Sequence, residues 1–275
     1  QGLEKEALEC LESSLALAKK KYGNSHIELA NIYEAIGDVY HAKGQLDEAL
    51  AEYEHSLELK KKFLYHNSLE YTSAYLRIGN ILTKKKSLNE ALVYLSKALQ
   101  IRLNRLGENS LLTAEAYDAV GMLYCTHEKY NEALEQIKKA FQIRLNILGE
   151  RHADISISNF NMARVLQLQG QYKEALQLFK QYLGVKLPLV GKNHLQVADC
   201  YLHKSEIYKL LGNYRKAIYN AQYALKIKQT KLGKRHLEVA NILLHRGNIY
   251  HFIKRYENML ADYNEALEIR LRAYG

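Results

Sequence analysis

Histidine is the side chain whose number and spacing in this sequence most suggest chemistry. The chain has 11 His, and imidazole is both a metal ligand and a proton carrier near neutral pH. His203 and His245 are 42 residues apart, but no third ligand accompanies them, and a zinc site needs three or four. We therefore expect no metal site. A second set recurs at multiples of 42 in loop-like segments, which predicts helix capping instead: His26, His152, His194 and His236.

The cysteines and the known nucleophile motifs predict no catalytic centre. Cys10, Cys125 and Cys200 form no Cys-x-x-Cys pair, so neither zinc nor redox chemistry is indicated. The sequence also lacks GxGxxG, GxxxxGK, GxSxG and HExxH motifs. We expect no enzyme activity and no cofactor. The odd number of cysteines favours a reducing compartment, namely the cytoplasm.

Composition and charge narrow the class of protein. Of 275 residues, 48% are hydrophobic and 25% charged, which excludes a disordered chain. There is no run of 18 apolar residues, so we expect no membrane span. The net charge of +9 leaves open an acidic partner.

The sequence repeats every 42 residues without insertion. One phrase reads GQLDEAL at 44–50, KSLNEAL at 86–92, EKYNEAL at 128–134 and GQYKEAL at 170–176. Variants of it continue as GNYRKAI at 212–218 and KRYENML at 254–260. A period of 20–50 residues is typical of solenoids, propellers and arrays.

Apolar residues within each repeat are spaced by three or four, which indicates helices. In the first repeat Ile32, Ile36, Val39 and Tyr40 share one stripe, and Gly44 permits a chain reversal before the next stripe. Each repeat is therefore expected to be a helical hairpin that buries its stripes by stacking. We predict a lone helix over 3–21 and then six pairs, thirteen helices in all, with first helices starting near 26, 68, 110, 152, 194 and 236.

Two recurring small residues give these hairpins a family resemblance. With Ala30 as repeat position 1, position 8 is always small: Gly37, Gly79, Gly121, Ala163, Ser205 and Gly247. Position 20 is Ala in five repeats and then Met: Ala49, Ala91, Ala133, Ala175, Ala217 and Met259. Close helix approach requires such residues. With the aromatic Tyr40 and Tyr53, the pattern resembles the tetratricopeptide repeat over the whole chain.

The 42-residue length and the LG-x-x-H loop resemble the longer-helix subtype found in kinesin light chain and nephrocystin. The chain departs from that subtype in lacking a Pro after the loop His and in keeping only Asn161 of the Asn residues expected on the first helices. The resemblance implies an all-α, right-handed superhelical solenoid over residues 1–275 as a single domain. Its expected parts are a half repeat and six repeats: 1–22, 23–64, 65–106, 107–148, 149–190, 191–232 and 233–275. Because the chain opens halfway through a repeat, we expect further sequence to flank it.

In this fold the first helices line a concave surface, where we expect a peptide groove. Amide and guanidinium groups would bind an extended backbone there, and apolar walls would hold side-chain anchors. The alternative is a solvated mixed face without a ligand. The candidate groove residues are Arg77, Asn80, Phe160, Asn161, Arg164, Leu202, His203, Glu206, Leu244, His245, Asn248 and Phe252.

Four further features depart from a regular repeat. Lys204 and Arg246 occupy an apolar position, where each either extends its head outward or binds an anion. Gly184 and Pro188 predict a bend or early end of the helix they share. The pairs Asn24-Ser25, Asn67-Ser68 and Asn109-Ser110 are predicted N-caps. Cations concentrate near the ends of the second helices, where they complement the helix dipole: Lys19–Lys21, Lys60–Lys62, Arg102, Arg105, Lys138, Lys139, Arg144, Lys226, Lys228, Arg270 and Arg272.

The function predicted from these features is protein recognition. The chain would act as an adaptor or scaffold that binds a protein or peptide in its groove, with neither a membrane nor a nucleic acid as the expected partner. One alternative is a regulatory or sensor arm of a larger protein that makes intramolecular contacts. Another is polyanion or nucleic-acid binding through the basic second helices. The sequence leaves the oligomeric state open.

Overall fold

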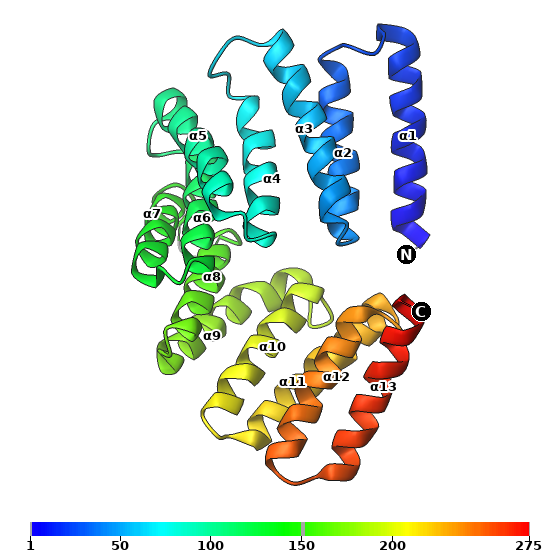
Figure 1. Cartoon of the computed structure of the whole chain (residues 1–275). Helices are drawn as coiled ribbons and strands as arrows, with labels where there is room; N and C mark the ends of the chain where they lie inside the picture. Colours follow the sequence, from blue (N-terminus) through cyan, green and yellow to red (C-terminus); the bar gives the residue numbers. More distant parts are fainter. Residues whose placement is uncertain (1, 150–151, 275) are drawn as a thin grey trace. The chain divides into compact units, whose positions relative to one another are not determined.

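The computed structural model describes residues 2–149 and 152–274, which form thirteen α-helices and no strand (Figure 1). The chain divides into two compact units, 1–147 and 148–275. Each unit is a stack of helical hairpins, a short α-solenoid. The thirteen helices and the all-α solenoid class confirm the sequence prediction, whereas a single domain over the whole chain stays a prediction.

The first unit holds the lone helix and three hairpins. Each helix packs against the next along the chain from α1 to α6, and Gly121 of α6 lies against Ile137 of α7. The seven helices are α1 (Gly2–Tyr22), α2 (Glu28–Ala42), α3 (Leu46–Phe63), α4 (Tyr71–Lys84), α5 (Leu88–Leu106), α6 (Leu111–Thr126) and α7 (Tyr130–Leu148).

The second unit holds three hairpins built in the same way. Successive helices pack from α8 to α13, and α8 also contacts α10. The six helices are α8 (Ile155–Leu168), α9 (Tyr172–Val190), α10 (Leu195–Leu210), α11 (Tyr214–Leu232), α12 (Leu237–Phe252) and α13 (Tyr256–Tyr274). The first helices of all six pairs begin one to three residues after the predicted starts.

Small residues at repeat position 8 let the two helices of a hairpin approach closely. A Cβ added to Gly37 would lie 2.5 Å from Cε1 of Tyr53, and one added to Gly79 would lie 2.4 Å from Cδ2 of Leu95. Both distances are far below van der Waals contact. The structure thus confirms why this position holds a small residue.

The hairpin turns place one residue in the left-handed region. Gly44 has φ 78° there, but the equivalent residues of other repeats are not all glycine: Lys86, Glu128 and Lys254 have φ values of 62°, 60° and 58°. A side chain in this region costs about 1 kcal/mol or more. The turn geometry is therefore kept even where the sequence does not favour it.

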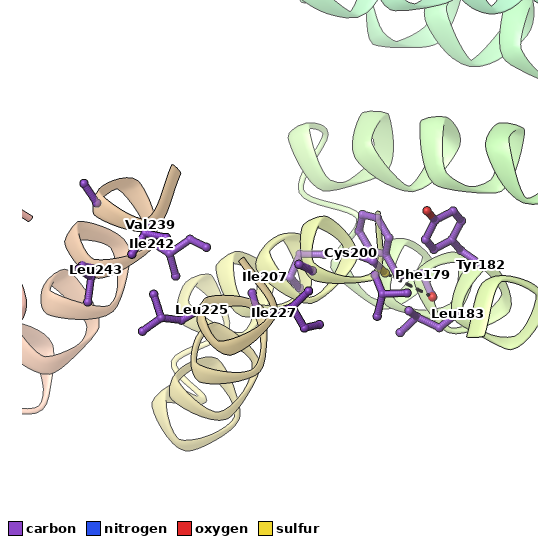
Figure 2. Close-up of a cluster of buried hydrophobic side chains, with 14 of the residues drawn as sticks. Phe179, Tyr182, Leu183, Cys200, Ile207, Leu225, Ile227, Val239, Ile242 and Leu243 are labelled. Carbon is purple, nitrogen blue, oxygen red and sulfur yellow. Dashed lines mark hydrogen bonds between the residues drawn. The ribbon is translucent and has the colours of Figure 1, made fainter. Parts of the chain in front are cut away.

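Apolar side chains from adjacent hairpins form a separate core in each unit. In the second unit this core includes residues of all six helices from α8 to α13, with Phe179 of α9, Ile207 of α10, Leu225 of α11 and Leu243 of α12 among its buried side chains (Figure 2). Cys200 is also fully buried in it; burial raises the pKa of this thiol to about 12, so it is inert.

Helix capping differs from the sequence prediction. None of the three Asn-Ser pairs caps a helix through a side chain; Ser110 occupies the N-cap of α6 without a side-chain bond, and the N-cap residues of α2 and α4 are Ile27 and Glu70. Two of the loop histidines cap helices, as their recurrence predicted: His194 is the N-cap of α10 and His236 that of α12. His26 and His152 make the same local bond, although the N-cap residues of α2 and α8 are Ile27 and Asp154. In each, Nδ1 accepts the backbone N–H two residues later at 3.2–3.3 Å: His26, His152, His194 and His236.

Pro188 does not end its helix, so an early end is wrong, whereas the bend given as the other outcome stays a prediction. The helix α9 continues through Pro188 to Val190 and is 19 residues long, like α5, α7 and α11. Gly184 is four residues before Pro188, where the ring of a proline crowds the preceding turn. A Cβ on Gly184 would meet nothing within 4 Å, which shows that the space around this turn is open.

Candidate functional site

The predicted groove residues of the second unit come from its three first helices. Phe160, Asn161 and Arg164 lie on α8, Leu202, His203 and Glu206 on α10, and Leu244 on α12. The other candidates on α12 are His245, Asn248 and Phe252, and Phe252 is the last residue of that helix. We call the surface formed by these ten residues the inner face. Its three helices are neighbours, because α8 contacts α10 and because Ser205 of α10 contacts His245 of α12.

His203 sits in an aromatic enclosure at the boundary of α8 and α10. Its ring stacks on Phe179 with centroids 5.5 Å apart and an interplanar angle of 11°, and meets the edge of Phe160 at 5.5 Å. Burial, with a contribution from Arg164, lowers the pKa of His203 to about 4. The ring is therefore neutral at pH 7, and the 3.0 Å contact of Nδ1 with Oε1 of Gln167 assigns its proton to Nδ1.

Glu206 and His245 form a polar bridge from α10 to α12. His245 Nδ1 lies 3.0 Å from Glu206 Oε2, and its Nε2 lies 2.9 Å from Ser205 Oγ. Lys209 binds the other oxygen of Glu206 at 2.7 Å. The hydrogen bond from His245 and the one from Lys209 lower the pKa of Glu206 to about 2. These residues hold the two helices together and are largely engaged with each other.

Asn161 and Arg164 are inner-face donors that remain available next to apolar side chains. Among the described residues neither side chain has a hydrogen bond or an ion pair. Both lie one turn apart on α8, so they face the same side of the helix. Both are half-buried beside Phe160, which packs on the core with Leu202 and Leu244. Free donors next to apolar walls are the arrangement that binds an extended peptide.

The end of α12 is more open. Phe252 is 58% exposed and stacks on Tyr214 with centroids 5.7 Å apart. Asn248 is exposed and accepts a hydrogen bond from the hydroxyl of Tyr263 at 2.5 Å. The side-chain oxygen of Asn248, a predicted groove residue, thus already has a hydrogen-bond partner within the chain.

The two candidates of the first unit differ from each other. Arg77 of α4 donates from Nε and Nη2 to Asp38 of α2 at 2.9 and 3.0 Å, and lies 3.2 Å from Glu34. Burial alone would raise the pKa of Asp38, but hydrogen bonds from Arg77 and Tyr53 lower it below its usual value. Arg77 would have to give up these bonds to bind a ligand. Asn80 is exposed on the same helix.

Family comparisons match this architecture. A model described as tetratricopeptide repeat matches residues 1–62, 70–146, 128–187 and 161–230, and a second model with that description matches 240–272. The chain belongs to the tetratricopeptide-repeat family. Members of this family are typically non-enzymatic scaffolds. No curated protein matches the chain.

Three solved structures illustrate the shared fold. A putative kinesin light chain of Podosopora anserina with nearly identical repeats is 17% identical, with TM-score 0.56 over 75% of this chain and 98% of that one. A Rap protein complexed with Competence and Sporulation Factor is 16% identical, with TM-score 0.63 over 98% and 86%. The Rap conjugation gene regulator of plasmid pLS20 with the Phr* peptide is 16% identical, with TM-score 0.69 over 98% and 70%. At these identities the likeness shows the fold.

Cations of the second helices have a role that the sequence analysis missed. In this tetratricopeptide-repeat chain, Lys60, Arg102, Arg144 and Lys228 are buried at the same repeat position and bind carboxylates of first helices. The partners are Glu34, Glu115, Asp118 and, for Lys228, both Asp199 and Glu238. The signal was present in the sequence, since a cation recurs at 60, 102, 144, 186, 228 and 270.

The two cations at apolar repeat positions are also placed. Arg246 is paired with Asp262, with Nε–Oδ2 and Nη2–Oδ1 distances of 2.8 and 2.6 Å. It is therefore not a free anion-binding group. Lys204 lies over Tyr201, with Nζ 5.0 Å from the ring centroid, and burial lowers its pKa.

The described residues hold no group of three or more His, Cys, Asp or Glu with the geometry of a metal site. In the same part of the chain, no helix is both long and apolar enough to cross a membrane.

Proposed function

We propose that this chain is a protein-interaction module, an adaptor or scaffold, that binds an extended peptide segment on the inner face of α8, α10 and α12. The observation that carries the proposal is the pair Asn161 and Arg164, which are unengaged among the described residues beside the half-buried Phe160. Amide and guanidinium donors would bind backbone carbonyls or a carboxylate of the peptide, and Phe160, Leu202 and Leu244 would contact its side chains.

Two further observations support a peptide ligand. Two solved structures with this fold are complexes, one with Competence and Sporulation Factor and one with the Phr* peptide. The fold also presents its first helices side by side, which gives a peptide several helices to contact at once. The structure shows no disulfide among the three cysteines, and we propose the cytoplasm as the site of action.

The polyanion alternative has less support. It depended on the cations of the second helices, but Lys60, Arg102, Arg144 and Lys228 are buried in ion pairs. Their charge is already balanced, so it adds little to attraction of a nucleic acid. No observation favours a catalytic role.

The test is a selection of random 12-residue peptides displayed on phage, with the natural chain as bait. Recovered peptides should bind the double variant Asn161→Ala, Arg164→Ala roughly 30-fold more weakly, because loss of one charged and one neutral hydrogen bond costs about 2 kcal/mol. The matched control is Gln177→Ala, Lys180→Ala, which removes the same kinds of group from the exposed side of α9 in the same repeat. Equal affinities for the natural chain and both variants would refute the proposal.

A further inference from the structure

A pocket in the first unit lies outside the inner face. It is about 650 Å³ in volume and is lined by α3, α4, α5 and the loop between α3 and α4. Ligand pockets are commonly about 300–1,000 Å³. Its walls include Tyr71, Tyr75 and Tyr94, which we call the tyrosine arc. The ring centroids of Tyr71 and Tyr75 are 6.1 Å apart, and those of Tyr75 and Tyr94 are 5.8 Å apart.

The tyrosine arc is particular to this repeat. Tyr71 is replaced by Leu29, Thr113, Ile155, Val197 and Val239 at the equivalent positions of the other repeats, and Tyr94 by Glu52, Gln136, Leu178, Asn220 and Asp262. The equivalent place in the last repeat is a pocket of about 200 Å³ without tyrosine, lined by Ile269, Arg272 and four charged residues. Tyr75 recurs as Tyr33, Tyr117 and Tyr201, but stacking of the repeats does not require tyrosine at 71 and 94, so these two residues need another explanation.

The rim of the pocket is basic and rich in amides. Lys61 of α3 and Lys97 of α5 lie there without an ion-pair partner among the described residues, and Glu90 is the single carboxylate of the lining. Asn67, Gln100 and Asn104 add amide donors and acceptors. His66 and Asn67 come from the one loop that lacks the recurrent glycine, and here the positive φ falls on Asn67.

The hydroxyls of the arc are also partly free. Tyr71 donates to the carbonyl of Leu64 at 2.9 Å, but the hydroxyls of Tyr75 and Tyr94 have no partner among the described residues. Burial raises the pKa of both phenols, so both remain donors at neutral pH.

We propose that this pocket of the first unit is a second binding site, for an acidic peptide segment that inserts one apolar side chain. Tyr75, Tyr94 and Ile101 would contact the inserted side chain, the amides would bind the peptide backbone, and Lys61 and Lys97 would pair with flanking carboxylates. The acidic partner also complements the net charge of +9.

The test uses phage-displayed random 12-residue peptides that are first depleted on the Tyr94→Glu variant and then selected on the natural chain. The fold accepts glutamate at this position, since Glu52 occupies it in the first repeat. We expect recovered peptides to combine an apolar residue with neighbouring Asp or Glu. Fluorescence anisotropy with synthetic copies should give a Kd at least tenfold weaker for Tyr94→Glu and for Lys97→Glu.

Matched controls come from the same repeat positions one repeat later. Gln136→Glu and Lys139→Glu should leave the Kd within twofold, and so should the inner-face variant Asn161→Ala, Arg164→Ala. No enrichment after depletion, recovered peptides without acidic residues, or equal loss of affinity in the controls would overturn the proposal. Loss only in the inner-face variant would assign the peptides to that face, which overturns this proposal but not the proposed function.

Discussion

The enclosure of His203 predicts how the second unit responds to acid. In the folded chain the pKa of His203 is lowered to about 4 from its usual 6.5, mainly by burial against Phe160 and Phe179. Below pH 6.5 the unfolded chain binds a proton at this ring and the folded chain does not. Stability is therefore lost as the pH falls from about 7 toward 4. Because proton binding and unfolding are linked, the difference between those two pKa values lowers the free energy of unfolding by about 2 kcal/mol between pH 7 and pH 5.

The surrounding charges do not cancel this effect. Arg164 of α8 and Lys228 of α11 also disfavour the charged ring, and Glu206 of α10 opposes them weakly. Glu206 itself has a pKa of about 2, so it does not titrate between pH 7 and pH 5. His41, whose pKa is also lowered, lies in the first unit, and the measurement must therefore be local to the second unit.

Hydrogen exchange of α10 amides, followed by mass spectrometry at pH 7 and pH 5 with correction for intrinsic rates, gives the local opening free energy. The natural chain should lose about 2 kcal/mol between these pH values, and His203→Phe, which keeps an aromatic ring in the enclosure, should lose less than half of that. His251→Phe is the control because His251 is exposed, and it should behave as the natural chain. If His203→Phe and the natural chain lose the same free energy, the assignment of His203 as a buried neutral ring is wrong.

Three other outcomes follow from the geometry. His236→Ala should destabilise the second unit by about 1 kcal/mol in urea unfolding because the cap of α12 is lost, and His236→Asn should restore most of it. Lys254→Gly should stabilise the same unit by up to about 1 kcal/mol, because its φ of 58° is strained for a side chain; a loss of stability would contradict that. Arg144→Met should cost about 3 kcal/mol because it removes one partner of the buried ion pair with Asp118, and adding Asp118→Leu should recover most of the loss in the same assay.

Sequence periodicity was sufficient to predict the helices. The 42-residue repeat and the spacing of residues such as Ile32 and Ile36 placed thirteen helices, and the small residues at Gly37 and Gly79 have the close contacts expected of them. These features depend on packing between neighbours in one repeating frame, which a single sequence displays directly. The early end at Pro188 was wrong because one local rule does not decide the course of a 19-residue helix.

Side-chain partners were harder to predict. Arg77 was predicted as a groove donor, but Asp38, one repeat earlier, binds it through two hydrogen bonds. His245 likewise has Glu206 and Ser205 as partners. Whether a polar side chain is free depends on residues about 40 positions away in the sequence. The repeat period predicts that such residues are close in space, but it does not predict the side-chain rotamers that decide whether they bond.

The buried cations also bear on how such a chain could gain or lose a module. Lys60 contacts Glu34 of its own repeat and Ser73 of the next. Excision of 72–113 would bring Glu115 to the place of Ser73 and leave the register intact. The junction would then place a carboxylate of each neighbouring repeat beside Lys60, which is the arrangement that Lys228 already has with Asp199 and Glu238. Excision of a length that is not a multiple of 42 residues would lose this register.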